Sequence, residues 1–129
     1  MQKRVIRERD IERKFVMEAK RRGGLAWKFI SPGNDGVPDR IVLLPDGRMA
    51  FAELKAPGKK PRPLQVKRKR QLESLGFRVY VIDGKEQIGD AIDEITDGRP
   101  DPPERRVQND EQLMPNLAEA GKEENDNDV

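Results

Sequence analysis

Blocks of apolar and polar residues predict seven helices and strands in the first 96 residues. Residues 7–22 form an amphipathic helix, and Gly23 and Gly24 supply the left-handed conformations that favour its end. The pattern then predicts strands at 25–30, 40–44 and 48–55, a helix at 64–75, a strand at 77–83 and a helix at 86–95. The order is therefore α β β β α β α, which indicates an α/β domain.

The loop between the second and third strands sets their register. Leu44-Pro45-Asp46-Gly47-Arg48 suits a three-residue loop, a type I turn followed by Gly47 in the left-handed conformation. This loop pairs Leu44 with Arg48, so Asp39 would face Glu53 with Lys55 on the same face. A two-residue loop would shift the register and place Asp39 on the opposite face from Glu53.

Both alternations of this strand pair are apolar, which is typical of a sheet covered on both faces. One alternation contains Ile41, Leu43, Met49 and Phe51, and the other contains Val42, Leu44, Ala50 and Ala52. Two acids at the rim of such a sheet repel each other and lose solvation, so a cation is expected between them. Lys55 could supply part of this charge and a divalent metal the rest. The alternative is a strand-end salt bridge between Lys55 and one acid.

Composition narrows the possible chemistry. The chain has no Cys and no His, which excludes Cys- or His-ligated zinc sites, disulfides, thiol nucleophiles and histidine bases. No apolar stretch is long enough to span a bilayer, and the charged N-terminus lacks the apolar region of a secretory signal. We therefore expect a soluble, cytoplasmic protein with no membrane partner.

Charge divides the chain into two parts. Residues 1–96 contain 22 Lys or Arg and 14 Asp or Glu, whereas residues 97–129 contain 4 and 10. The basic part predicts either a polyanionic partner or a merely solvated surface. The acidic part has little periodic apolar content and is expected to be a disordered tail, either inert or competing with nucleic acid for the basic surface. The predicted domains are one α/β domain at 1–96 and this tail at 97–129.

The residues also resemble a known family. Pro38-Asp39, thirteen intervening residues and Glu53-Leu54-Lys55 resemble the signature of PD-(D/E)XK nucleases. Gly36-Val37 before this motif and Gln65 at the next helix are similar to the VRR-NUC branch. The resemblance covers about residues 6–96 and implies a restriction-endonuclease-like αβββαβ core, with a mixed central sheet flanked by helices.

The resemblance implies a site that fits the available chemistry. Asp39, Glu53 and the backbone carbonyl of Leu54 would hold Mg²⁺ or Mn²⁺, while Lys55 would orient or deprotonate a water and Gln65 would support the site. The resemblance also implies that an acid of the first helix is a further metal ligand and catalytic residue. Glu12 is preferred because it shares a helical face with the apolar residues Phe15, Val16 and Ala19. Glu8 is the alternative, and Glu18 is a third possibility.

The implied function is a metal-dependent endonuclease that hydrolyses DNA phosphodiester bonds, selective for branched DNA such as Holliday (four-way) junctions and acting as a homodimer. A nickase, a flap nuclease and a non-catalytic DNA-binding protein are alternatives. The stripe of Ile88, Ile92 and Ile95 is one candidate dimer surface, although core packing is the preferred interpretation. The candidate DNA contacts are Lys28, Ser31, Gly33, Arg40, Lys59, Lys60, Arg62 and Lys67.

Overall fold

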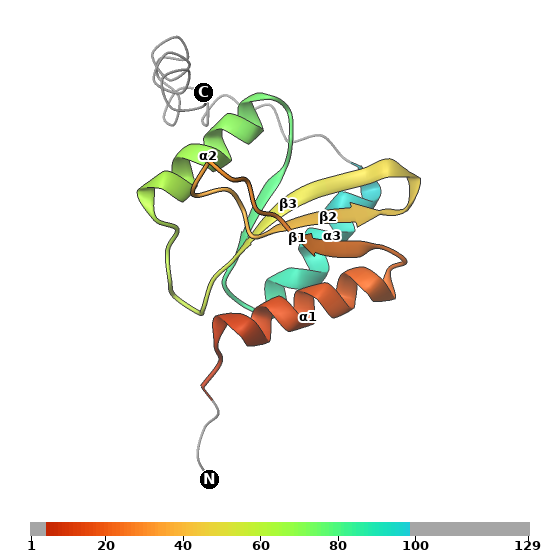
Figure 1. The fold of residues 1–129 in the computed structure, drawn as a ribbon. Coiled ribbons are helices and arrows are strands. Elements are labelled where there is room, and N and C mark those ends of the chain that lie inside the picture. The colour runs from red at the N-terminus through yellow and green to blue at the C-terminus, as the bar shows by residue number, and fades with distance from the viewer. Residues whose placement is uncertain (1–4, 99–129) are drawn as a thin grey trace.

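The computed structural model describes residues 5–98, which form one sheet with helices on both faces (Figure 1). The elements are α1 (Glu8–Arg21), β1 (Leu25–Lys28), β2 (Arg40–Leu44), a short 3-10 turn η1 (Pro45–Gly47), β3 (Arg48–Leu54), α2 (Pro63–Ser74), β4 (Val79–Ile82) and α3 (Glu86–Asp97). The predicted order of helices and strands is confirmed. No helix within residues 5–98 has the length and apolar character needed to cross a membrane.

The sheet is mixed, as predicted. Its strand order is β1-β2-β3-β4, with antiparallel pairs β1–β2 and β2–β3 and a parallel pair β3–β4. The parallel pair requires a crossover, which α2 provides on one face, while α1 and α3 lie together on the other (Figure 1). The ends of β2 and β3 that carry the candidate acids therefore lie between these two helical layers.

The β2–β3 hairpin has the predicted register but not the predicted turn. Leu44 pairs with Arg48 and Arg40 pairs with Ala52, as a three-residue loop requires. Asp46, however, has φ 66° and ψ 26°, so the turn is not type I, and Gly47 follows with φ 72°. The prediction of a type I turn was wrong because aspartate tolerates the left-handed region better than most residues. The loop length, and hence the register, is unaffected.

The core lies on the α1/α3 face of the sheet. All four residues of one alternation are buried there: Val42, Leu44, Ala50 and Ala52. On the other face Phe51 is buried, but Ile41, Leu43 and Met49 are only half-buried, because α2 covers only part of it. The apolar stripe on α3 is also in the core, as the preferred interpretation of the sequence predicted: Ile88, Ile92 and Ile95.

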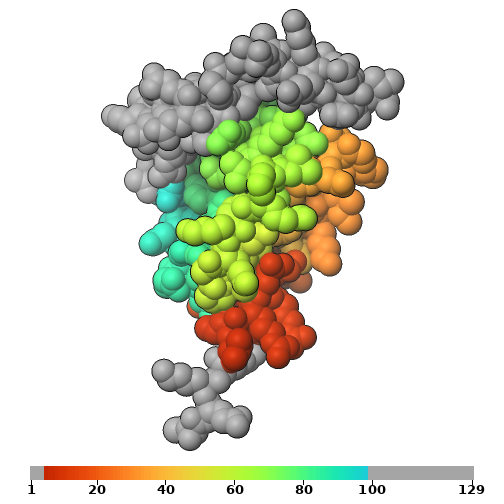
Figure 2. All heavy atoms as spheres, turned by 90° about the vertical axis from the view of Figure 1, so that its left-hand side faces the viewer, coloured from red at the N-terminus to blue at the C-terminus, as the bar shows by residue number. Residues whose placement is uncertain are grey.

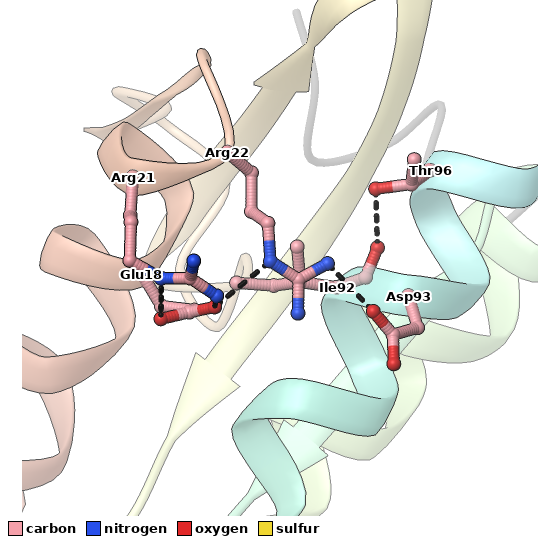
Figure 3. A network of polar contacts seen from close by, with 6 residues as sticks. All are labelled: Glu18, Arg21, Arg22, Ile92, Asp93 and Thr96. Carbon is pink, nitrogen blue, oxygen red and sulfur yellow. Dashed lines mark hydrogen bonds and ion pairs between the residues drawn. The ribbon is translucent and has the colours of Figure 1, made fainter.

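A charged contact connects α1 to α3. The Glu18 carboxylate accepts hydrogen bonds from Arg21 at 2.5 and 2.9 Å and from Arg22 at 2.8 Å. Arg22 also donates to Asp93 of α3 at 2.6 Å (Figure 3). The hydrogen bond from Arg21 is the main reason that the pKa of Glu18 falls to about 2. Glu18 thus links the two helices and is not available to the candidate site.

The predicted tail lies outside the described residues apart from its first two, so the domain boundary stays a prediction.

Candidate active site

Backbone pairing fixes Asp39 beside the end of β3. The Phe29 N–H donates to the Asp39 carbonyl at 2.8 Å, which continues the β1–β2 pairing to the position just before β2. The Asp39 carboxylate reaches across the hairpin, where its Oδ2 accepts the backbone N–H of Leu54 at 2.8 Å. Asp39 thus lies next to Glu53, as the register predicts.

Glu53 is a buried acid with an unsatisfied oxygen. Its residue is only 3% exposed, and its Oε1 has no hydrogen-bond partner. Burial, followed by a hydrogen bond with the Asp39 carboxyl and the charge of Asp39, raises the pKa of Glu53 to about 8. Ionisation of Glu53 beside the Asp39 charge is therefore unfavourable, as it is for closely placed carboxyls. A cation at this position would relieve the same repulsion.

Lys55 acts on these acids through its charge. Its backbone N–H donates to the Ile82 carbonyl at 2.8 Å, which extends the β3–β4 pairing and fixes the position of the residue. Its positive charge lowers the pKa of Glu53 and of Glu8, against the larger raising effects. Among the described residues Lys55 forms no ion pair with Asp39 or Glu53. The alternative of a strand-end salt bridge is therefore not observed.

The first helix brings Glu8, rather than Glu12, close to the site. Burial and the negative charge of Asp39 raise the pKa of Glu8, which shows that Glu8 lies in the field of the candidate acids. Glu12 instead pairs with Arg40, whose Nη2 lies 2.5 Å from Glu12 Oε1. The structure thus places Glu8, and not the preferred Glu12, in the field of Asp39, and which acid joins the site stays a prediction.

Strand alternation explains this difference. Arg40 shares its alternation with the buried Val42 and Leu44, so its side chain lies on the α1/α3 face, where Glu12 also lies. Asp39 falls in the opposite alternation, so the middle of α1 is separated from it by the sheet. Arg40 was a candidate DNA contact, but its guanidinium is bound by Glu12 and by the Ala26 carbonyl. The period-two pattern of residues 40–44 was the signal that could have placed it correctly.

Gln65 holds the beginning of α2 next to this site. It is buried, and its Oε1 accepts the backbone N–H of Arg62 at 2.8 Å, which caps the helix. Gly36, in the turn before Asp39, has φ 87°, and a Cβ there would lie 2.8 Å from Leu64 Cγ. The glycine therefore allows the motif to approach α2 closely.

The remaining candidate DNA contacts fall into two groups. Lys59, Lys60 and Arg62 lie in the exposed loop between β3 and α2, and Figure 2 shows this loop beside α1. The second group lies elsewhere on the fold, with Lys28 at the end of β1, Ser31 and Gly33 in the next turn, and Lys67 on α2. The Ser31 Oγ accepts a hydrogen bond from Asn34 at 3.2 Å, so this serine also stabilises its own turn.

The donor set fits a divalent metal with few protein ligands. Within residues 5–98 no three acidic side chains converge into a complete metal site. The available oxygens are the Asp39 and Glu53 carboxylates and the adjacent Leu54 carbonyl. Mg²⁺ is commonly bound through one or two carboxylates and keeps several waters. The unpartnered Oε1 of Glu53 is the observation that favours such an ion here.

The sequence and the fold are similar to those of two other proteins. No protein-family model matches the sequence. A protein named "Putative nuclease p44", from Acyrthosiphon pisum secondary endosymbiont phage 1, is 49% identical over 83 residues, which are 64% of this chain and 89% of that protein. A solved structure named "VRR_NUC domain" is similar with a TM-score of 0.63 and 29% identity, covering 67% of this chain and 94% of the other. The chain belongs to the VRR-NUC nuclease family.

For this VRR-NUC nuclease, the site lies at one end of the sheet and combines parts from four segments. The segment before β2 provides Asp39, β3 provides Glu53 and leads to Lys55, the first turn of α1 brings Glu8 near, and the capped start of α2 lies beside them. The sequence predicted that Asp39, Glu53 and Lys55 belong to this site. It did not find that the Leu54 N–H fixes Asp39, because a backbone partner leaves no signal in residue type.

Proposed function

We propose that this VRR-NUC nuclease is a metal-dependent endonuclease that hydrolyses phosphodiester bonds in DNA. The buried acid pair supports the proposal, because burial and Asp39 raise the pKa of Glu53 to about 8 and one of its oxygens has no hydrogen-bond partner. Such a pair is unfavourable for stability and for approach to a phosphate unless a cation binds to it. A pure DNA-binding protein would gain nothing from it.

Asp39, Glu53 and the Leu54 carbonyl would hold Mg²⁺ or Mn²⁺. When bound, such an ion would lower the pKa of a water and offset charge on the scissile phosphate. The chain's own residues would do the rest. The Leu54 N–H keeps Asp39 in a single orientation, and the Lys55 ammonium, on the same face of β3 as Glu53, would orient the attacking water. Glu8 would add negative charge at the edge of the site.

The exposed loop before α2 would hold the DNA strand. Lys59, Lys60 and Arg62 lie in it without an ion pair among the described residues, so their charges are available to phosphates. The Gln65 cap fixes the end of this loop. Gln65 would thus support the site by positioning the loop rather than by touching the reacting atoms.

We also propose that the substrate is branched DNA, such as a four-way junction, and that the enzyme is a homodimer. A two-fold pair of sites would match two symmetric strands. The α3 stripe is buried in the core, so it is not the dimer surface. Strand β1 is at the edge of the sheet and has two exposed apolar side chains on one face, Leu25 and Trp27, the latter 60% exposed. This face is the surface that we propose for the second copy.

The decisive experiment measures cleavage of end-labelled linear duplex, nicked, flap and four-way-junction DNA with Mg²⁺, Mn²⁺ or EDTA. Wild type is compared with Asp39→Ala and Lys55→Ala, and Arg48→Ala serves as the matched control, because Arg48 is an exposed cation on the distant hairpin. We expect metal-dependent cleavage that both site variants lose and the control keeps. Symmetric cuts in the junction would support the resolvase, and cuts in nicked or flap DNA would support the alternatives. Binding without cleavage by wild type would refute the enzyme.

The catalytic unit would be residues 1–96. Every buried core residue of the described chain lies between Ile11 and Ile95, so the acidic segment is not needed for the core. Deletion of residues 100–129 should therefore leave the melting temperature nearly unchanged. A large fall in that temperature would show that the segment is structural.

A further inference from the structure

A hollow of about 820 Å³ lies along the outer side of α1, away from the candidate acids. Its lining includes none of Asp39, Glu53 and Lys55. The lining residues come from α1 and from the turn before α3: Asp10, Arg13, Lys14, Met17, Glu18, Lys20, Arg21 and Lys85. The active site does not account for this surface.

Helical spacing explains how the cations gather there. Residues three and four apart are neighbours on a helix surface. Met17 therefore has four cationic neighbours: Arg13 and Lys14 lie one turn before it, and Lys20 and Arg21 lie one turn after it. Met17 is itself 63% exposed, so it forms an apolar surface between these two pairs of cations.

The two acids of the hollow are engaged by local contacts. Asp10 accepts the backbone N–H of Arg7 at 2.9 Å, which caps the start of α1. Glu18 is bound by Arg21 and Arg22. Four cations of the lining have no ion pair among the described residues: Arg13, Lys14, Lys20 and Lys85. The hollow is therefore a surface of uncompensated positive charge.

We propose that this hollow is a second DNA-binding surface, which holds the phosphate backbone of a duplex arm beside the cut. The inference rests on the proposed function, and it specifies the surface along which the DNA continues beyond the proposed active site. Helix α1 connects the two places, because Glu8 lies near the acids and Arg21 lies at the far end of the hollow. At 1.5 Å per residue the helix spans about 20 Å, which corresponds to about six base pairs of duplex.

Spacing along the helix favours a nucleic-acid backbone as the occupant. Arg13 and Lys20 are seven residues apart on one line of the helix surface, and Lys14 has the same spacing to Arg21, whose guanidinium also binds Glu18. Each pair spans about 10 Å, the rise of about three nucleotides of one strand. Two parallel rows of cations fit a charged strand that follows α1. An acidic protein segment is the competing occupant and is one outcome of the test.

The test compares wild type with Lys14→Ala/Lys20→Ala and with Lys85→Ala, using Arg48→Ala as the control. Alanine favours helix formation, and both α1 lysines lack partners, so the fold should persist, which circular dichroism checks. Binding of uncut duplex is measured in EDTA over a salt series and with arms from about 4 to 20 base pairs. We expect wild-type affinity to rise once an arm exceeds about six base pairs. The double variant should lose this rise, and its slope of log K against log salt should fall by about two.

Equal arm-length dependence and equal salt slopes in wild type and the double variant would overturn the inference. So would loss of binding to a synthetic acidic peptide together with unchanged DNA binding, because it would assign the hollow to protein. These binding measurements do not require cleavage. The inference and the proposed nuclease activity can therefore fail separately.

Discussion

Glu12 of α1 and Arg40 of β2 form an ion pair at the edge of the candidate site. Glu12 Oε1 accepts hydrogen bonds from Arg40 Nε at 2.9 Å and Nη2 at 2.5 Å, while Arg40 Nη1 donates to the Ala26 carbonyl at 3.0 Å. The Arg40 side chain is 14% exposed and the Glu12 side chain 25%. A single guanidinium thus joins α1, β1 and β2 immediately after Asp39. The contact connects the helix that carries Glu8 to the strand that begins after Asp39.

Removing the Glu12 carboxylate should lower stability clearly. Glu12→Ala leaves the Arg40 guanidinium partly buried without its charged partner, so the free energy of unfolding should fall by about 1.5–3 kcal/mol. Urea unfolding measures the change. Arg21→Ala is the control, because Arg21 is 67% exposed and ion pairs at exposed positions contribute little to stability. Equal small losses in both variants would show that the Glu12–Arg40 pair is only a surface contact.

The two acids of α1 should differ in their effect on cleavage. Glu8→Gln removes a charge that acts on Asp39 and Glu53, so metal-dependent cleavage should fall by about 10–100-fold, as for residues that support a metal site. Glu12→Gln keeps an oxygen for Arg40 and should retain most of the activity. Cleavage rates across a metal titration compare the two variants. A larger loss in Glu12→Gln than in Glu8→Gln would restore Glu12 as the helix acid.

The sequence predicted the acid pair because loop length determines register. A three-residue loop pairs Leu44 with Arg48, and this pairing brings Asp39 and Glu53 together however the turn itself is formed. The wrong turn type therefore did not change the predicted register. The Gly47 position was also correct, since glycine is the residue most suited to a positive φ.

The partner of Arg40 could not be predicted with the same certainty, because contacts between a helix and a sheet depend on tertiary packing. Helical periodicity places Glu12 towards the sheet, and the structure confirms this orientation. It does not say which strand residue lies opposite, or that the acids project from the other face. The Leu54 N–H that holds Asp39 and the hollow along α1 depend likewise on distances that periodicity does not contain.

Two glycines offer a direct measure of how closely the motif packs on α2. Gly36 and Gly33 have φ of 87° and 86°, so alanine at either position should cost about 1–2 kcal/mol for the left-handed backbone. Gly33 has nothing within 4 Å of a Cβ, whereas a Cβ at Gly36 would meet Leu64 at 2.8 Å. Urea unfolding should therefore show a larger loss for Gly36→Ala than for Gly33→Ala. Equal losses would mean that α2 moves away freely.

The buried acid should make the metal-free protein less stable as pH rises. Glu53 titrates near 4.5 when unfolded and about 8 when folded, so between these values the unfolded chain releases a proton that the native state keeps. The stability that Glu53 contributes is present below pH 4.5 and is lost as pH rises through about 8. Glu53→Gln removes this loss, so with EDTA the variant should exceed wild type in unfolding free energy at pH 8 by more than at pH 5.

Metal addition distinguishes this electrostatic effect from a packing effect of the amide. At pH 8, Mg²⁺ or Mn²⁺ should raise the unfolding free energy of wild type, because a cation bound to Asp39 and Glu53 stabilises only the native state. The same addition should raise that of Glu53→Gln much less, so the advantage of the variant should shrink or reverse. Glu86→Gln, at an exposed position on α3, is the control for a lost carboxylate and should respond as wild type does. A constant advantage of Glu53→Gln at all pH values and metal concentrations would assign it to packing.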